Sequence, residues 1–160
     1  MIRGLTGFLL VLALSLFAKA APDAKAYTHT AAAGGVEVKV VYAPPGYFQA
    51  AGDTEGARRF RPGGQVVFLI TLDTHAGDLM RFDVVRNSRL RTKGGTPREY
   101  PPAKWEAISD GSHHRSGGVI FPATVNGTKL LGPGVTAITL VITNLAGVPA
   151  RAFEWTLPVR

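Results

Sequence analysis

The amino-acid sequence predicts an all-β fold, with an antiparallel β-sandwich as the first architecture and a small β-barrel as the alternative. Apolar and polar residues alternate with period two in several segments, as half-buried strands require. Clusters of glycine, proline and asparagine separate these segments at short intervals. No window beyond the amino-terminal segment carries the apolar stripe of an amphipathic helix. We therefore expect many short strands joined by turns, and little helix.

The first 20 residues match a cleaved export signal. Residues 1–3 form a short basic start, residues 5–17 are apolar, and Ala-Lys-Ala at 18–20 has the pattern that signal peptidase recognises. The apolar run is shorter than the roughly 20 residues of a membrane-spanning helix. After cleavage we expect no membrane span and a periplasmic or secreted protein. Residues 21–35, rich in Ala, Thr and Gly, are expected to form a flexible leader.

The mature amino terminus is expected at Ala21, because Ala18 and Ala20 occupy the small-residue positions before the cut. Measuring the intact mass of the exported protein tests this expectation. A mass that still includes residues 5–17 would contradict it.

The remaining chain, residues 36–160, is predicted to form a single domain that opens with a strand at 36–42. Residues 43–64 contain Pro-Pro-Gly and Pro-Gly-Gly and are predicted to be a long connection with little regular structure. The run 66–72 is apolar on both faces, which is typical of a central strand covered from two sides.

The second half of the domain is predicted to consist of further short strands. Met80, Phe82 and Val84 alternate with polar residues and indicate a strand, and a short strand follows around Trp105. Asn126-Gly127 indicates a tight hairpin. Further strands are predicted at 119–121, 138–142 and 153–157. Trp105 and Trp155 are assigned to the core.

Composition excludes several kinds of chemistry. The chain has no cysteine, so it has no thiolate nucleophile, no iron–sulfur cluster and no copper site of the cysteine-ligated kind. The net charge is +7, and removing residues 1–20 takes away two basic side chains and no acid. Aromatic residues are not interleaved with the arginines as a single-strand binding groove requires, so we expect no nucleic-acid partner.

Catalytic motifs are scarce. The chain contains no Gly-x-Ser-x-Gly, no phosphate loop and no His-Glu-x-x-His. Ser112 and Ser116 lie beside His113 and His114, but neighbours in sequence do not form the spatial arrangement of a serine triad. An enzyme is therefore only the third hypothesis.

The histidines are the main candidates for chemistry. Of the four in the chain, His75 follows the predicted central strand, and His113 and His114 lie together in a polar turn. Loops at one end of a sandwich can bring such turns together. Three imidazoles would suit zinc or copper(II). Candidate oxygen ligands are Asp73, Asp78, Glu106 and Asp110. The alternative is that these histidines only bond neighbouring turns or are solvated. His29, in the leader, is not expected to matter.

Arg115, which directly follows His114, is predicted to fix the histidine loops together. Its planar guanidinium can make paired contacts with a carboxylate. Asp73 and Asp110 are the candidate carboxylates. The same fork could instead bind a carboxylate or phosphate ligand, which we consider the less favoured role.

Four segments form a recognisable pattern: D-T-H at 73–75, a tryptophan at 105, H-H-R-x-G at 113–117 and F-x-W at 153–155. In this pattern the chain, from Val66 to Leu157, resembles a group of uncharacterised exported bacterial and archaeal proteins. The resemblance places the three loop histidines on the group's histidine positions and Arg115 on its arginine. It strengthens the expectation of a metal site and implies no particular activity.

Two functional hypotheses follow. The first is an extracytoplasmic metal-binding protein that holds copper(II) or zinc through His75, His113 and His114, with Asp73 as a candidate further ligand. The second is a non-catalytic module of the cell envelope that binds a protein or an anionic polymer through residues 43–64 and the basic arginines.

Overall fold

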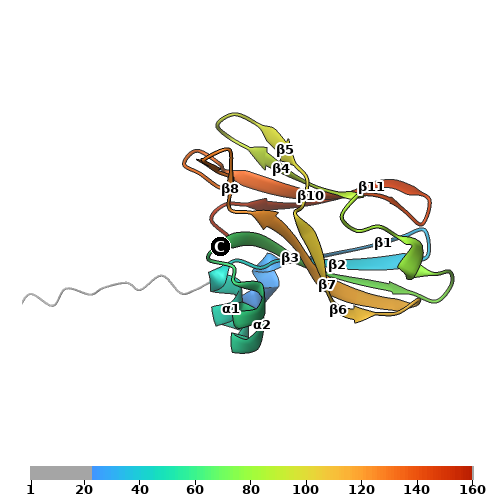
Figure 1. The fold of residues 1–160 in the computed structure, drawn as a ribbon. Coiled ribbons are helices and arrows are strands. Elements are labelled where there is room, and N and C mark those ends of the chain that lie inside the picture. Colours follow the sequence, from blue (N-terminus) through green and yellow to red (C-terminus); the bar gives the residue numbers. More distant parts are fainter. Residues whose placement is uncertain (1–22, 160) are drawn as a thin grey trace, which may run out of the picture.

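The computed structural model describes residues 23–159 and shows a sandwich of antiparallel sheets (Figure 1). The five-stranded sheet has the order β1-β2-β3-β7-β6, and the four-stranded sheet has the order β11-β10-β4-β5. A separate two-stranded ribbon pairs β8 with β9. Among the described residues no sheet closes into a barrel, so the fold is the predicted sandwich and the barrel alternative is wrong.

The helical elements are η1 (Ala24–Tyr27), α1 (Pro45–Ala51), α2 (Thr54–Phe60) and η2 (Leu79–Arg81). The strands are β1 (Thr28–Ala33), β2 (Val36–Tyr42), β3 (Gln65–Thr74), β4 (Ser88–Lys93), β5 (Arg98–Tyr100), β6 (Lys104–Asp110), β7 (His114–Pro122), β8 (Thr124–Val125), β9 (Thr128–Lys129), β10 (Ala137–Leu145) and β11 (Val148–Thr156).

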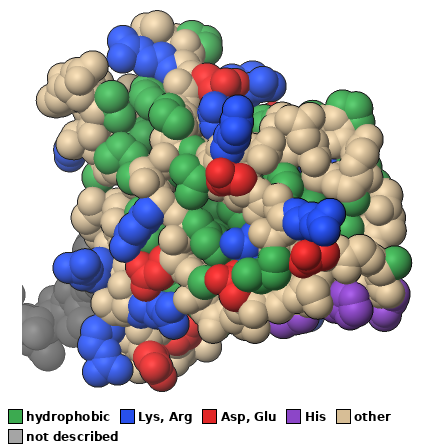
Figure 2. All heavy atoms as spheres, turned by 45° about the vertical axis from the view of Figure 1, so that its right-hand side comes forward, with side chains coloured by type: hydrophobic (Ala, Val, Ile, Leu, Met, Phe, Trp, Pro, Cys, Tyr) green, Lys and Arg blue, Asp and Glu red, His purple; other side chains and the backbone are tan. Residues whose placement is uncertain are grey.

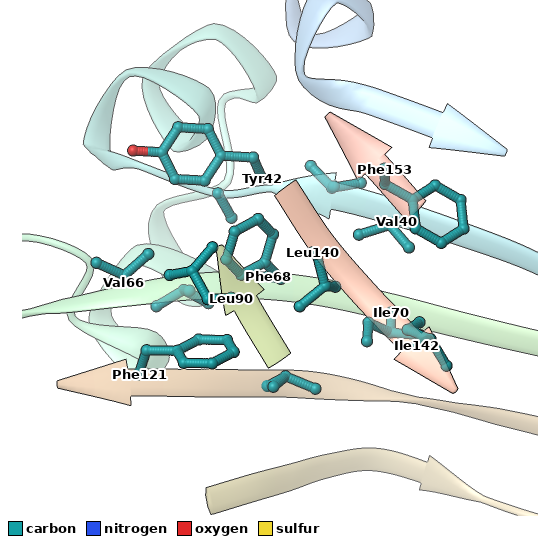
Figure 3. Packing of buried hydrophobic residues seen from close by; sticks show 14 of the residues in the cluster. Val40, Tyr42, Val66, Phe68, Ile70, Leu90, Phe121, Leu140, Ile142 and Phe153 are labelled. Atoms are coloured by element: carbon teal, nitrogen blue, oxygen red, sulfur yellow. The ribbon is translucent and has the colours of Figure 1, made fainter. Parts of the chain in front are cut away.

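The core fills the space between the two large sheets (Figure 3). β3 lies in the middle of the five-stranded sheet and directs Phe68 and Ile70 inward. Leu140 and Ile142 of β10 approach them from the other sheet, and all four side chains are buried. Alternate residues of each strand therefore supply the apolar surface whose removal from water stabilises the sandwich. The central position predicted for residues 66–72 is confirmed.

The helices α1 and α2 cover one end of the outer face of the five-stranded sheet (Figure 1). Phe60, the last residue of α2, lies directly on Gly118 of β7, and a Cβ at that glycine would come within 2.5 Å of the ring. Glycine at 118 thus allows the helix pair to approach the sheet closely. Val67, on the same face of β3, is buried, so this half of β3 is covered from both sides.

The prediction that residues 43–64 hold little regular structure is wrong. Two seven-residue helices occupy most of this segment, each too short to display an apolar stripe. Their ends did carry local signals. Pro45 begins α1, Gly52 ends it in the left-handed conformation, and the Asp53 carboxylate caps α2 by accepting a hydrogen bond from Gly56 N at 2.8 Å.

The predicted leader also differs from the structure. Residues 28–33, expected to be part of a flexible leader, form strand β1 at the edge of the five-stranded sheet, so the sandwich begins before the predicted boundary at Val36. An exposed edge strand of small residues needs no apolar alternation, which is why the sequence pattern did not reveal it. The predicted export signal at 1–20 and Ala21 lie outside the described residues.

The predicted strand at 80–84 is wrong for a different reason. Residues 79–81 form a short 3-10 turn. The Asp78 carboxylate caps this turn by accepting a hydrogen bond from Met80 N at 2.9 Å. The carbonyls of Leu79 and Phe82 accept hydrogen bonds from Arg115 rather than from a neighbouring strand. Local capping and one distant side chain thus override the period-two pattern.

Strands β4 and β5 were not predicted. In β4 the inward residues are Ser88, Leu90 and Thr92, and the outward ones include Arg89 and Arg91. Only one of the three inward side chains is apolar, so hydropathy alone does not reveal the alternation. The other predicted strands and the Asn126-Gly127 hairpin are present. Within residues 23–159, no helix has the length and apolar character needed to cross a membrane.

Candidate functional site

The candidate site lies at the end of the sandwich opposite the helix pair, where β3 ends and β7 begins. Asp73 and His114 are direct partners in the antiparallel register of these two strands. His75 follows β3 in an exposed loop, and His113 lies in an exposed bend just before β7. Figure 2 shows histidine side chains gathered along one edge of this end of the molecule.

His114 and Asp73 are joined by a hydrogen bond between Nδ1 of the imidazole and Oδ1 of the carboxylate. A carboxylate can only accept, so Nδ1 of the imidazole donates the proton of this bond. When the ring is neutral, the other ring nitrogen, Nε2, carries the lone pair. Both side chains are about half exposed, at 57% and 46% for His114 and Asp73.

Backbone hydrogen bonds hold the two histidine loops together. Thr74 N donates to His113 O at 2.9 Å, and Leu79 N donates to Ser112 O at 2.8 Å. The hydroxyl of Thr74 also bonds the carbonyl of Gly35 at 2.9 Å, which attaches the β1–β2 turn to the same end. The loops that carry His75 and His113 are therefore neighbours, although the two residues are far apart in the sequence.

The three histidines do not form a ready metal site. Among residues 23–159, no group of three or more histidine, cysteine, aspartate or glutamate side chains is arranged to hold a metal ion. The exposed loop histidines share one end of the molecule, and only His114 has a fixed partner among the acids predicted as ligands. His29 lies elsewhere, with its ring 4.8 Å from that of Trp155.

The other candidate oxygen ligands have structural partners. Asp78 caps η2 and lies 3.6 Å from Arg81. Glu106 bonds Lys104 and Arg59, and the hydrogen bonds from these two cations hold the pKa of its carboxyl below the ordinary value. Glu106 opposes Gly118 on β7, four residues and roughly 13 Å along the strand from His114. The structure therefore does not bring Glu106 to the histidines.

Arg115 joins the segments that surround the site. Its Nε donates to Asp110 at 2.6 Å, and Nη1 donates to the carbonyls of Phe82 at 2.7 Å and Leu79 at 3.2 Å. The guanidinium also lies 5.4 Å from the ring of Trp105. The arginine is 9% exposed, so these contacts satisfy a buried cation. Of the two carboxylates considered from the sequence as partners of Arg115, Asp110 accepts its hydrogen bond, and Asp73 bonds His114 instead.

The structure contains a second buried arginine that the sequence patterns did not reveal. Arg151 of β11 is 5% exposed and donates to the carbonyls of Leu145 at 3.0 Å and Ala33 at 2.8 Å. Burial lowers the pKa of its guanidinium. Arg151 lies two residues before Phe153 and four before Trp155, so its side chain points to the same inward face of β11. This alternation in the sequence could have revealed that Arg151 is buried. The contacts attach β11 to the β1–β2 hairpin near the site.

The surface next to α1 and α2 contains a hollow that is the second candidate binding site. The hollow is lined mainly by apolar groups, including those of Pro45, Phe48, Ala57 and Pro62, and Asp53 and Arg61 are its charged lining residues. Comparison of the chain with family models, curated proteins and solved structures finds no match.

Proposed function

We propose that this protein binds a divalent transition metal ion, copper(II) or zinc, at the histidine end of the sandwich. In this proposal His114 is the primary ligand, His75 and His113 supply further imidazoles, and Asp73 orients His114. Because residues 1–20 match an export signal, we place this activity in the periplasm or outside the cell.

The hydrogen bond between His114 and Asp73 is the observation that carries the proposal. Histidines that bind metals commonly donate their second ring N–H to a carboxylate, which fixes the tautomer and raises the basicity of the ligating nitrogen. His114 has this arrangement, with Nδ1 bonded to Asp73 and the ring half exposed. Asp73, considered from the sequence as a direct ligand, is better suited to this orienting role.

The neighbouring loops support additional ligands. His113 precedes His114, and the loop of His75 is bonded to the backbone of His113 through Thr74. Both side chains are exposed, so they can turn toward an ion without disturbing the core. Ordering these side chains costs conformational entropy, and we therefore expect moderate affinity rather than that of a preformed site.

Calorimetric titration of Cu²⁺ and Zn²⁺ into the purified protein tests the proposal. We expect at least one ion to bind with a Kd below about 10 μM. His114→Ala should weaken binding most, and Asp73→Asn should weaken it by about tenfold or more, because the amide is a poorer partner for the Nδ1 proton. Affinity should fall below about pH 6.5, where free histidine takes up a proton.

His29→Ala is the matched control, since it removes an imidazole outside the site and should leave the affinity unchanged. If neither ion binds below about 10 μM, or if His75→Ala and His114→Ala both bind like the unchanged protein, the metal hypothesis is wrong.

A cell-envelope interaction module is the second candidate. The apolar hollow beside α1 and α2 favours it, because Arg61 lines this apolar surface together with Asp53, and Arg58 is exposed on α2. A protein or anionic polymer would be the partner. This function takes precedence if the titration finds no metal binding.

A further inference from the structure

Sandwich proteins must protect the edges of their sheets, because an open edge pairs readily with another strand. The large sheets of this protein end in four edge strands, which are β1 and β6 in one sheet and β5 and β11 in the other. Three of these edges have features that discourage pairing, and β1 does not.

The three protected edges differ in how they are protected. β6 has a register irregularity between Ala107 and Ser109 and carries the ion pairs of Glu106. β5 is only three residues long and includes Arg98 and Glu99. β11 contains Pro149 near its start, which cannot donate a backbone hydrogen bond. Bulges, charges, proline and short length are the usual means of preventing edge-to-edge association.

β1 has the sequence Thr-His-Thr-Ala-Ala-Ala, with no proline, no lysine, arginine or acid, and its pairing with β2 is regular throughout. Four of its six residues are exposed and the other two are partly exposed. The strand is therefore an accessible, regular edge of small side chains.

The turn between β1 and β2 determines which backbone groups point outward. Gly34 and Gly35 form a two-residue turn with positive φ at both positions, so the flanking residues Ala33 and Val36 form a hydrogen-bonded pair. Hydrogen-bonded and non-hydrogen-bonded positions alternate along an antiparallel pair. The N–H and C=O groups of Thr30 and Ala32 consequently face away from β2.

We propose that the protein forms a two-fold symmetric dimer by antiparallel pairing of β1 with β1 of a second copy. With Ala31 on the symmetry axis, Thr30 lies opposite Ala32 of the second copy, and the reverse pair follows from symmetry. The outward groups of these residues then form four main-chain hydrogen bonds. The five-stranded sheets become one continuous sheet.

The charges on β2 favour this register. Lys39 is the β2 partner of Thr30, and Glu37 is the partner of Ala32. In the dimer, one row across the outer face therefore contains Lys39, Thr30, and then Ala32 and Glu37 of the second copy. The β2 strands are three strand spacings, roughly 14 Å, apart. Extended lysine and glutamate side chains reach toward each other over the small residues between them, which brings the opposite charges to within roughly 6 Å without direct contact.

Symmetry produces this Lys39–Glu37 pairing twice. Both side chains are exposed, and neither takes part in an ion pair within residues 23–159. Charge complementarity thus favours a second copy in the antiparallel arrangement as the occupant of this edge.

Sedimentation equilibrium of the purified protein tests the proposal. We expect a monomer–dimer equilibrium between about 1 μM and 1 mM. Lys39→Glu should raise the dimer Kd at least about tenfold, because it places like charges together at two symmetric positions. Glu37→Lys should do the same. The double variant Lys39→Glu, Glu37→Lys should restore the Kd of the unchanged protein.

Lys93→Glu is the matched control, because it makes the same change in charge on an exposed position of β4, away from β1. It should leave dimerisation unchanged. A second measurement is amide hydrogen exchange, in which the N–H groups of Thr30 and Ala32 should be more protected at high protein concentration. A monomer throughout this concentration range overturns the proposal, as does a dimer in which the double variant fails to restore what the single variants lose.

Discussion

Replacing Trp155 by alanine is expected to lower the free energy of unfolding by about 3–5 kcal/mol. Trp155 is 3% exposed, and its ring lies 5.5 Å from Phe68 and 6.1 Å from Tyr42. Its Nε1–H also donates to the carbonyl of Tyr27 at 3.0 Å, which attaches the segment before β1 to the last strand. The substitution removes packing between the two sheets and one buried hydrogen bond. Chemical denaturation of the variant and the unchanged protein measures this loss.

Two further variants separate the contributions. Trp155→Phe keeps an aromatic ring but removes the donor to Tyr27, so it should cost less, about 1–2 kcal/mol. Glu154→Ala changes the adjacent exposed residue and should alter stability by less than about 0.5 kcal/mol. A loss below about 1 kcal/mol for Trp155→Ala would mean that the closing strand contributes little to the core.

Replacing Arg115 by lysine should cost about 2–4 kcal/mol of stability. A single ammonium group cannot reproduce the contacts of the guanidinium with Asp110, with two carbonyls of the 79–82 segment and with the face of Trp105. The substitution therefore leaves buried polar groups without partners. Denaturant titration measures the change in unfolding free energy.

The same variant also tests the link between this arginine and the histidine end. Arg115 follows His114 and holds the segment after the His75 loop, so Arg115→Lys should reduce metal affinity in the titrations described above. Arg81→Lys is the matched control, because Arg81 is 89% exposed and pairs with Asp78 only at 3.6 Å. Equal stability of the Arg115→Lys variant and the unchanged protein would contradict the role of Arg115 as the joint between these segments.

The sequence predicted which histidine loops meet at the site but not the partners of each side chain, because those partners come from distant parts of the chain. Histidine is rare in this chain, which makes His75, His113 and His114 candidates for the site, and the structure does bring their loops to one end. Their exact partners could not be predicted. The bond between His114 and Asp73 depends on a strand register set by the pairing of β3 with β7, and no local pattern encodes that register.

Three of the elements that the sequence did not reveal share a physical cause. β1, α1 and α2 have weak or very short hydrophobic patterns. They form because they pack against neighbouring elements: β1 pairs with β2, and Gly118 leaves room for Phe60 at the end of α2. The predicted strand at 80–84 failed in the opposite way. Its residues alternate between apolar and polar, but the carbonyls of Leu79 and Phe82 accept hydrogen bonds from Arg115 and not from a neighbouring strand.

The sequence by itself determined the all-β class and the strands whose inward side chains are apolar, because period-two burial in a sheet leaves a direct trace in hydropathy. Only the tertiary structure decided where the edges lie, which acid bonds His114, and that Arg115 and Arg151 are buried. These features depend on contacts between residues distant in the chain. Such contacts satisfy backbone carbonyls and charges that the local sequence leaves unpaired.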